Sequence, residues 1–166
     1  MRLRRPSLAE SVVAGSCGLW VGFFLAAETA WAIPVALGAA GLTLLLPQRP
    51  LRAGAALALL QVGLAVIHVP DGNAAGIAPF ILAVYTLGRL APTWPGIAVA
   101  ATFPVTTVVD AFALDTFLFA IFMTGAVYAY GRVVQHRARA AEQALRAASE
   151  LQATCLLYTS PSPRDS

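Results

Sequence analysis

The sequence predicts an all-α membrane protein: a six-span helical bundle with a cytoplasmic helical stalk that continues from the last span. Of its 166 residues, 58% are apolar and only 11% are charged, whereas soluble domains carry about a quarter charged residues. The apolar residues gather in runs that suit a hydrocarbon core about 30 Å thick. The last run starts at Phe117 and passes Arg132, and no Gly or Pro lies between Arg132 and Gln152. Ala, Leu, Arg, Glu and Gln dominate this continuation, and all are strong helix formers.

The first two spans follow from length. Ser7 and Glu10 have the spacing of a capping box, which predicts a helix start just before the first apolar run. As one helix, the weakly charged stretch from Ser11 to Leu46 would be about 54 Å long, too long for a single crossing. The chain must therefore fold back, and Glu28 with Thr29 is the predicted turn.

Turn signals separate the remaining spans. Short basic or Pro- and Gly-containing segments at 47–52, 70–73 and 89–95, and the Asp-flanked segment 110–115, predict the connections. Pro104 is expected to kink the fifth span. The predicted spans are 9–27, 30–46, 53–69, 75–91, 95–109 and 116–132.

The charges predict the orientation. With the amino terminus inside, the Arg residues of the short loops and of the stalk all fall on the cytoplasmic side, and the acidic residues of the alternate loops fall outside. We therefore expect a multi-pass protein of the plasma membrane with both termini cytoplasmic. The lipid bilayer is its expected partner, and nothing in the pattern of Arg residues indicates direct binding of nucleic acid.

Ionisable residues near the membrane are candidates for function because their burial is costly. Five of them map to the outer ends of the spans and could line a pocket that responds to protons or to a cationic ligand: Glu28, His68, Asp71, Asp110 and Asp115. The alternative is that they are interfacial turn residues in contact with headgroup water. Their spacing matches no metal-binding pattern, and the sequence contains no motif for a catalytic or cofactor-binding site.

Two further patterns have structural explanations. Gly18 and Gly22 form a GxxxG pair that would allow close helix packing within the bundle or, alternatively, a dimer contact. Trp31 and Trp94 lie where an aromatic belt would anchor the bundle at the membrane surface.

The stalk carries the spacing of a coiled coil, and its seam, extended by Gln152, consists of Val134, Ala138, Ala141, Leu145 and Ala148. A competing stripe leaves the register open; it consists of Val133, Ala140, Ala144, Ala147 and Leu151. A homodimer through the stalk is expected if the seam continues into a dimerising domain. The alternative is a solvated basic helix that lies against anionic lipid.

The end of the chain has a different character. Residues 155–165 read CLLYTSPSPRD, which resembles a translated sequencing adapter. On this interpretation the chain is a fragment cut off near Thr154. It would then divide into a transmembrane domain at 1–132, a signalling helix at 133–154 and a disordered, adapter-derived tail at 155–166.

Two stretches, Tyr85-Thr-Leu-Gly-Arg89 and the exit helix YGRVVQHRARAAEQALRAASELQ, and the overall layout resemble the amino-terminal sensor region of two-component histidine kinases. The subgroup is that of small membrane kinases paired with helix-turn-helix response regulators. The resemblance implies that Arg132 and the seam transmit a membrane-borne signal to a kinase core. That core would use ATP and Mg to phosphorylate its own His and would then pass the phosphate to a response regulator. No cofactor is expected in the residues present.

Two other classes of protein remain open. A small transporter-like protein would use the outer carboxylates to bind its substrate, although transporter sites usually lie near the midplane at broken helices. The chain could also be the membrane anchor of another signalling enzyme, such as a nucleotide cyclase, because the stalk is compatible with either output.

Overall fold

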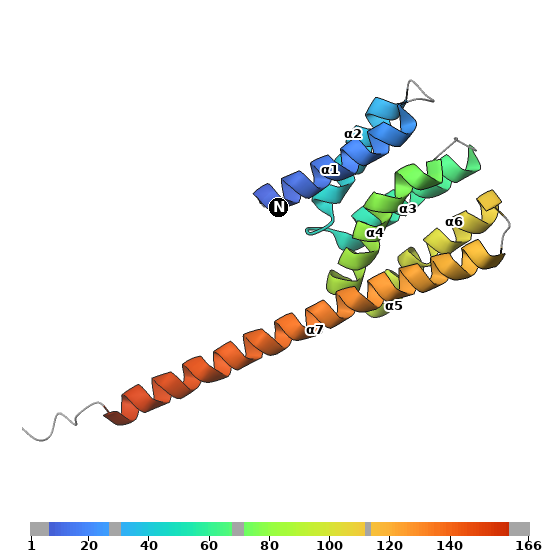
Figure 1. Cartoon of the computed structure of the whole chain (residues 1–166). Coiled ribbons are helices and arrows are strands. Elements are labelled where there is room, and N and C mark those ends of the chain that lie inside the picture. Colours follow the sequence, from blue (N-terminus) through green and yellow to red (C-terminus); the bar gives the residue numbers. More distant parts are fainter. Residues whose placement is uncertain (1–6, 27–30, 68–71, 112–113, 160–166) are drawn as a thin grey trace, which may run out of the picture.

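The computed structural model describes residues 7–26, 31–67, 72–111 and 114–159, except for the side chains of 72–73, 107–111 and 156–159. Within these residues the chain is entirely helical apart from short turns, and it forms seven helices (Figure 1). They are α1 (Leu8–Leu25), α2 (Ala32–Leu45), α3 (Pro50–Val66), α4 (Gly72–Leu90), α5 (Thr93–Ala100), α6 (Thr102–Ala111) and α7 (Leu114–Thr159).

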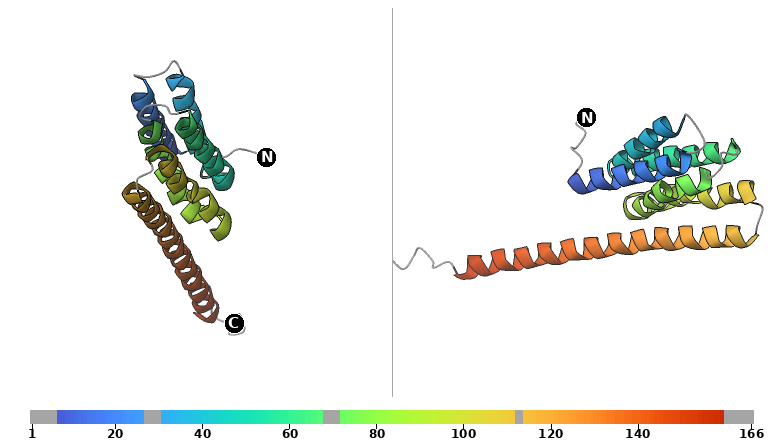
Figure 2. Two further views of the ribbon diagram at one scale, coloured as in Figure 1. Left: turned by 90° about the vertical axis from the view of Figure 1, so that its right-hand side faces the viewer. Right: turned by 45° about the horizontal axis from the view of Figure 1, so that its top comes forward.

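The helices run back and forth between two ends of a bundle. The carboxyl ends of α1, α3 and α6 lie at the same end as the amino ends of α2, α4 and α7 (Figures 1 and 2). Because their amino ends lie at the same end of the bundle, α4 and α7 run the same way (Figure 1). Helix α4 is central: it contacts α1, α2, α3, α5 and α7, so α4 and α7 lie side by side.

The start of α1 agrees with the sequence. The Glu10 backbone N–H donates to the Ser7 hydroxyl at 3.2 Å, and the Ser7 N–H donates to Glu10 Oε2 at 2.7 Å. These two bonds form the predicted capping box and satisfy two of the free donors at the helix end.

Small residues bring α1 and α2 together. A Cβ atom on Gly18 would lie 3.0 Å from Ala40 Cβ, and one on Gly22 would lie 3.5 Å from Ala36 Cβ. The GxxxG pair therefore packs inside the bundle, as the first of its two interpretations predicts. The adjoining core contains Val21 and Leu25, each 1% exposed.

Several boundaries differ from the sequence prediction by a few residues, and one predicted span is divided. Helix α3 begins at Pro50, so the second half of the predicted turn at 47–52 is helical, because Pro suits the first helical position. Helix α4 already includes Gly72, which the sequence placed in a turn. The segment predicted as the fifth span forms two helices, α5 and α6, and not one kinked helix.

The predicted continuous exit helix is confirmed. Helix α7 has 46 residues, which corresponds to a length of about 69 Å. It packs along the bundle and then projects far beyond it (Figure 2).

The prediction of a disordered tail at 155–166 is wrong for its first part, because Cys155 to Thr159 continue α7. No Gly or Pro lies between Gly131 and Pro161, so no local signal ends the helix before this Pro. Residues 160–166 lie outside the described residues.

Two of the described helices are long and apolar enough to cross a membrane: α1, and the part of α7 from Leu114 to Cys155. Three shorter apolar helices accompany them, at Ala32–Leu45, Pro50–Val66 and Ala74–Leu90.

Candidate functional site between α4, α6 and α7

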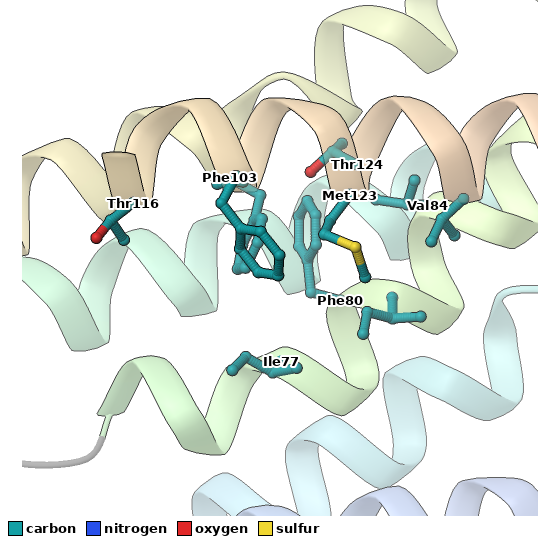
Figure 3. Close-up of a pocket in the computed structure, with 11 residues that line it drawn as sticks. Ile77, Phe80, Val84, Phe103, Thr116, Met123 and Thr124 are labelled. Carbon is teal, nitrogen blue, oxygen red and sulfur yellow. The ribbon is translucent and has the colours of Figure 1, made fainter. Parts of the chain in front are cut away.

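Helices α4, α6 and α7 line a partly open cavity of about 300 Å³ (Figure 3). None of the described residues that line it is charged, and Thr116 and Thr124 supply its side-chain hydroxyls. The described residues that line it are Ile77, Phe80, Ile81, Val84, Phe103, Thr116, Phe119, Ala120, Met123, Thr124 and Val127. The cavity is therefore an apolar space directly beside the helix that leaves the bundle.

The break between α5 and α6 shapes one wall of the cavity. Pro104 has no backbone N–H, and its ring would clash with the carbonyl of Ala100, the last residue of α5. In the new helix that starts at Thr102, Phe103 stacks on Phe80, with ring centroids 4.5 Å apart and an interplanar angle of 20° (Figure 3). Phe80 is itself buried, at 3% exposure. The break thus places an aromatic pair on the cavity wall.

The opposite wall is a stripe of α7. Residues 119–120, 123–124 and 127 recur at helical spacing, so they share one face. Ala120 is 4% exposed and leaves room because its side chain is one methyl group. Met123 adds a flexible thioether that can adapt to an irregular shape.

Beyond the cavity, towards the carboxyl end of α4, helices α4 and α7 meet at two glycines. A Cβ atom on Gly131 would lie 2.5 Å from the carbonyl oxygen of Tyr85, and one on Gly88 would collide with the carbonyl oxygen of Tyr128. Backbone atoms form both obstacles, so a side-chain rotation cannot relieve either collision. Only glycine allows the two helices to approach this closely.

Polar contacts tie α7 to the start of α5 at the same level. The Tyr128 hydroxyl donates to the Thr93 carbonyl oxygen at 3.2 Å. Arg132 Nη2 donates to Thr93 Oγ1, and Arg132 Nη1 donates to Gln135 Oε1 at 3.1 Å. From His136 to Cys155 every residue of α7 is exposed. Helix α7 is therefore attached to the bundle as far as Gln135, and from His136 to Cys155 it does not contact the bundle.

The predicted outer-face cluster is not assembled by the described residues. Glu28, His68 and Asp71 lie outside them, and Asp110 belongs to α6 with its side chain not described. Asp115 is exposed in the first turn of α7, where its Oδ1 accepts the Thr116 N–H at 2.8 Å. A shared pocket of these five residues stays a prediction.

The residues predicted to transmit the signal differ in burial, and the change falls at the end of the bundle. Arg132 and Val134 are partly buried, whereas Ala138, Ala141, Leu145 and Ala148 are exposed. The competing stripe is exposed as well, with Leu151 at 68%. Both stripes are available to a second chain, and the register and the homodimer stay predictions.

Sequence reasoning missed the cavity and the role of the two glycines. One signal was present: α4 and α7 both contain Tyr-x-x-Gly-Arg, at 85–89 and at 128–132. Each copy places a glycine next to the Arg that marks the cytoplasmic end of a predicted span, so both glycines should lie at one depth. The cavity left no comparable signal, because apolar residues at helical spacing usually form ordinary core.

No protein-family model, curated protein or solved structure matches the chain. The class of protein is therefore defined by its own architecture: an all-helical bundle with two helices able to cross a membrane and an apolar cavity on its longest helix.

Proposed function

We propose that the chain is the membrane-embedded input region of a signalling protein, a six-span bundle that passes a membrane-borne stimulus to a cytoplasmic output through α7. One observation carries the proposal: α7 is a single helix, packed on α4 and α6 in its first half and free of the bundle beyond Gln135. A rigid helix of about 69 Å converts a small displacement at its packed end into a larger one at its free end.

Exposed apolar side chains support a membrane setting. Helices α1, α2, α3 and α7 each expose large apolar side chains to their surroundings. Soluble monomers rarely expose many such side chains together. The exposed side chains include Leu19 (78%), Phe23 (77%), Ile33 (72%), Leu37 (69%), Leu59 (72%) and Phe122 (71%). In a bilayer these side chains would contact lipid. The helices α5 and α6 would then cross as a pair and make the fifth span.

The placement of charge supports the orientation. Arg49, Arg52, Arg89 and Arg132 belong to the end of the bundle where α3 starts and α4 ends, and Asp115 belongs to the opposite end. Basic residues of short loops favour the cytoplasmic side. Trp31 and Trp94, 73% and 81% exposed, begin α2 and α5 at opposite ends, as anchors at two interfaces would. Both termini would then be cytoplasmic.

The proposed output is a histidine kinase core. This step depends on the resemblance to two-component sensor kinases. The two stretches that carry the resemblance, 85–89 and the start of the exit helix, contact each other through Gly88 and Gly131. A conformational change at this contact would move α7 relative to α4. The kinase core would supply the ATP and Mg chemistry, a homodimer through the stalk and the response regulator as partner.

A transporter is a weaker interpretation of the α5–α6 break. Broken transporter helices use free backbone groups to bind substrates and ions. Here the Thr102 hydroxyl donates to the Val99 carbonyl at 2.7 Å, and the Ala101 N–H donates to the Ile97 carbonyl at 2.8 Å. Local bonds therefore occupy these groups.

A chimera tests the proposal. Residues 1–152 are joined to the dimerisation and catalytic core of a soluble histidine kinase, with single-residue insertions that cover one heptad at the junction. Autophosphorylation in membranes should vary with a period of about 3.5 residues, because each insertion rotates the seam. A Gly-Gly insertion after Gln135 should remove this dependence, whereas an Ala-Ala insertion there should only shift it. Equal activity in every chimera would contradict the proposal.

A further inference from the structure

We propose that the cavity between α4, α6 and α7 is a binding site for a small, neutral, predominantly apolar molecule, and that its occupancy sets the position of α7. The second half of this inference rests on the proposed function. The first half, binding, stands on the cavity alone.

The lining defines the chemistry of the ligand. The described lining residues carry no charge, so a charged ligand would lose its hydration without gaining a partner. Phe80, Phe103 and Phe119 offer aromatic surface, and the sulfur of Met123 can contact an aromatic ring of the ligand favourably. The hydroxyls of Thr116 and Thr124 leave room for at most one or two polar atoms.

The volume defines the size. An enclosed apolar cavity of about 150 Å³ holds benzene, so the partly open cavity of about 300 Å³ has room for roughly a dozen non-hydrogen atoms. That is the lower end of the range for small-molecule sites. The space suits a compact ring system, and it is short for the whole acyl chain of a bilayer lipid. A diffusible molecule dissolved in the membrane is therefore the proposed occupant.

The position of the cavity gives binding a consequence. The stripe of α7 formed by Ala120, Met123 and Val127 forms its wall. About one turn beyond Val127, Gly131 fixes α7 against Tyr85 of α4. A ligand that fills the cavity keeps the part of α7 before Gly131 away from α4 and α6, and an empty cavity allows this part to move towards them. The glycine contact would act as the pivot of that movement.

Photolabelling tests binding without any output domain. The 166-residue chain, reconstituted in phosphatidylcholine nanodiscs, is labelled with a diazirine-substituted naphthalene and digested for mass spectrometry. Labelling within 77–84 and 116–127 should saturate and should be competed by naphthalene. Labelling that rises linearly and resists competition would show partition into lipid only and would overturn the proposal.

Matched variants locate the site. Ala120→Phe fills the cavity, and we expect it to lower the saturable labelling by about tenfold or more. The control, Ala129→Phe, adds the same side chain at an exposed position of α7 that does not line the cavity, and it should leave the labelling within about twofold. Equal labelling of both variants would refute the assignment. Should Ala120→Phe fail to fold, Met123→Ala serves instead, because the enlarged cavity should gain saturable labelling by an anthracene analogue, and no gain would refute it.

The two proposals fail separately. Saturable labelling, together with chimeras whose autophosphorylation does not depend on the register of the junction, would support the ligand site and overturn the signalling function. Register-dependent activity without saturable labelling would retain the signalling function and overturn the ligand site.

Discussion

Gly88 of α4 lies against the backbone of α7 at Tyr128, and Gly131 of α7 lies against the backbone of α4 at Tyr85. A Cβ atom on Gly131 would lie 2.5 Å from the Tyr85 carbonyl oxygen and 3.2 Å from the Arg89 nitrogen. Both glycines belong to a Tyr-x-x-Gly-Arg segment, and the two segments run in the same direction. The approach is one of backbone to backbone, so it controls the spacing between the bundle and its exit helix.

The first prediction concerns this contact. Gly131→Ala should lower the free energy of unfolding by about 1–3 kcal/mol, because the new methyl group meets backbone that cannot rotate away. Gly125→Ala is the matched control on the same helix, where a Cβ would meet nothing within 4 Å. The control should be neutral or stabilising by up to about 1 kcal/mol, since Ala favours the helix. Unfolding in detergent, followed by helical circular dichroism, measures both, and equal stability of the two variants would contradict the close contact.

The second prediction concerns the hydroxyl of Tyr128. Tyr128→Phe removes the hydrogen bond to the Thr93 carbonyl and should lower the free energy of unfolding by about 0.5–1.5 kcal/mol. Tyr130→Phe, two residues further along α7, is the control, because Tyr130 is 64% exposed. It should change stability by less than about 0.5 kcal/mol. A loss at Tyr130 as large as that at Tyr128 would argue against the link between α7 and α5.

The third prediction concerns topology. A periplasmic reporter such as alkaline phosphatase should be active when fused after Asp71 and inactive when fused after Pro92. The reason is that Arg49, Arg52 and Arg89 should hold their loops in the cytoplasm under the proposed orientation. A cytoplasmic reporter such as β-galactosidase should give the opposite pattern at the same two positions. Cytoplasmic activity after Asp71 would overturn the proposed orientation.

The sequence anticipated the helices because their causes are local. The Ser7–Glu10 capping box, the helix start before each apolar run and the unbroken exit past Arg132 all follow from spacing within one segment. Pro104 marked a disturbance in the predicted fifth span, but the formation of two separate helices also depends on how α6 packs against α3 and α7. The outer-face residues were candidates on charge alone, and of these the structure describes the side chain of Asp115.

The all-helical class, the approximate limits of the helices and the length of α7 follow from the order of residues alone, because hydropathy and helix propensity act within a segment. Which helices touch is a property of the folded chain. In a chain so rich in Gly and Ala, many faces could pack closely, and no local pattern selects α4 as the neighbour of α7. The meeting of Gly88 with Gly131, and the cavity beside Phe80 and Phe103, arise from that choice, because both belong to paired surfaces and not to single helices.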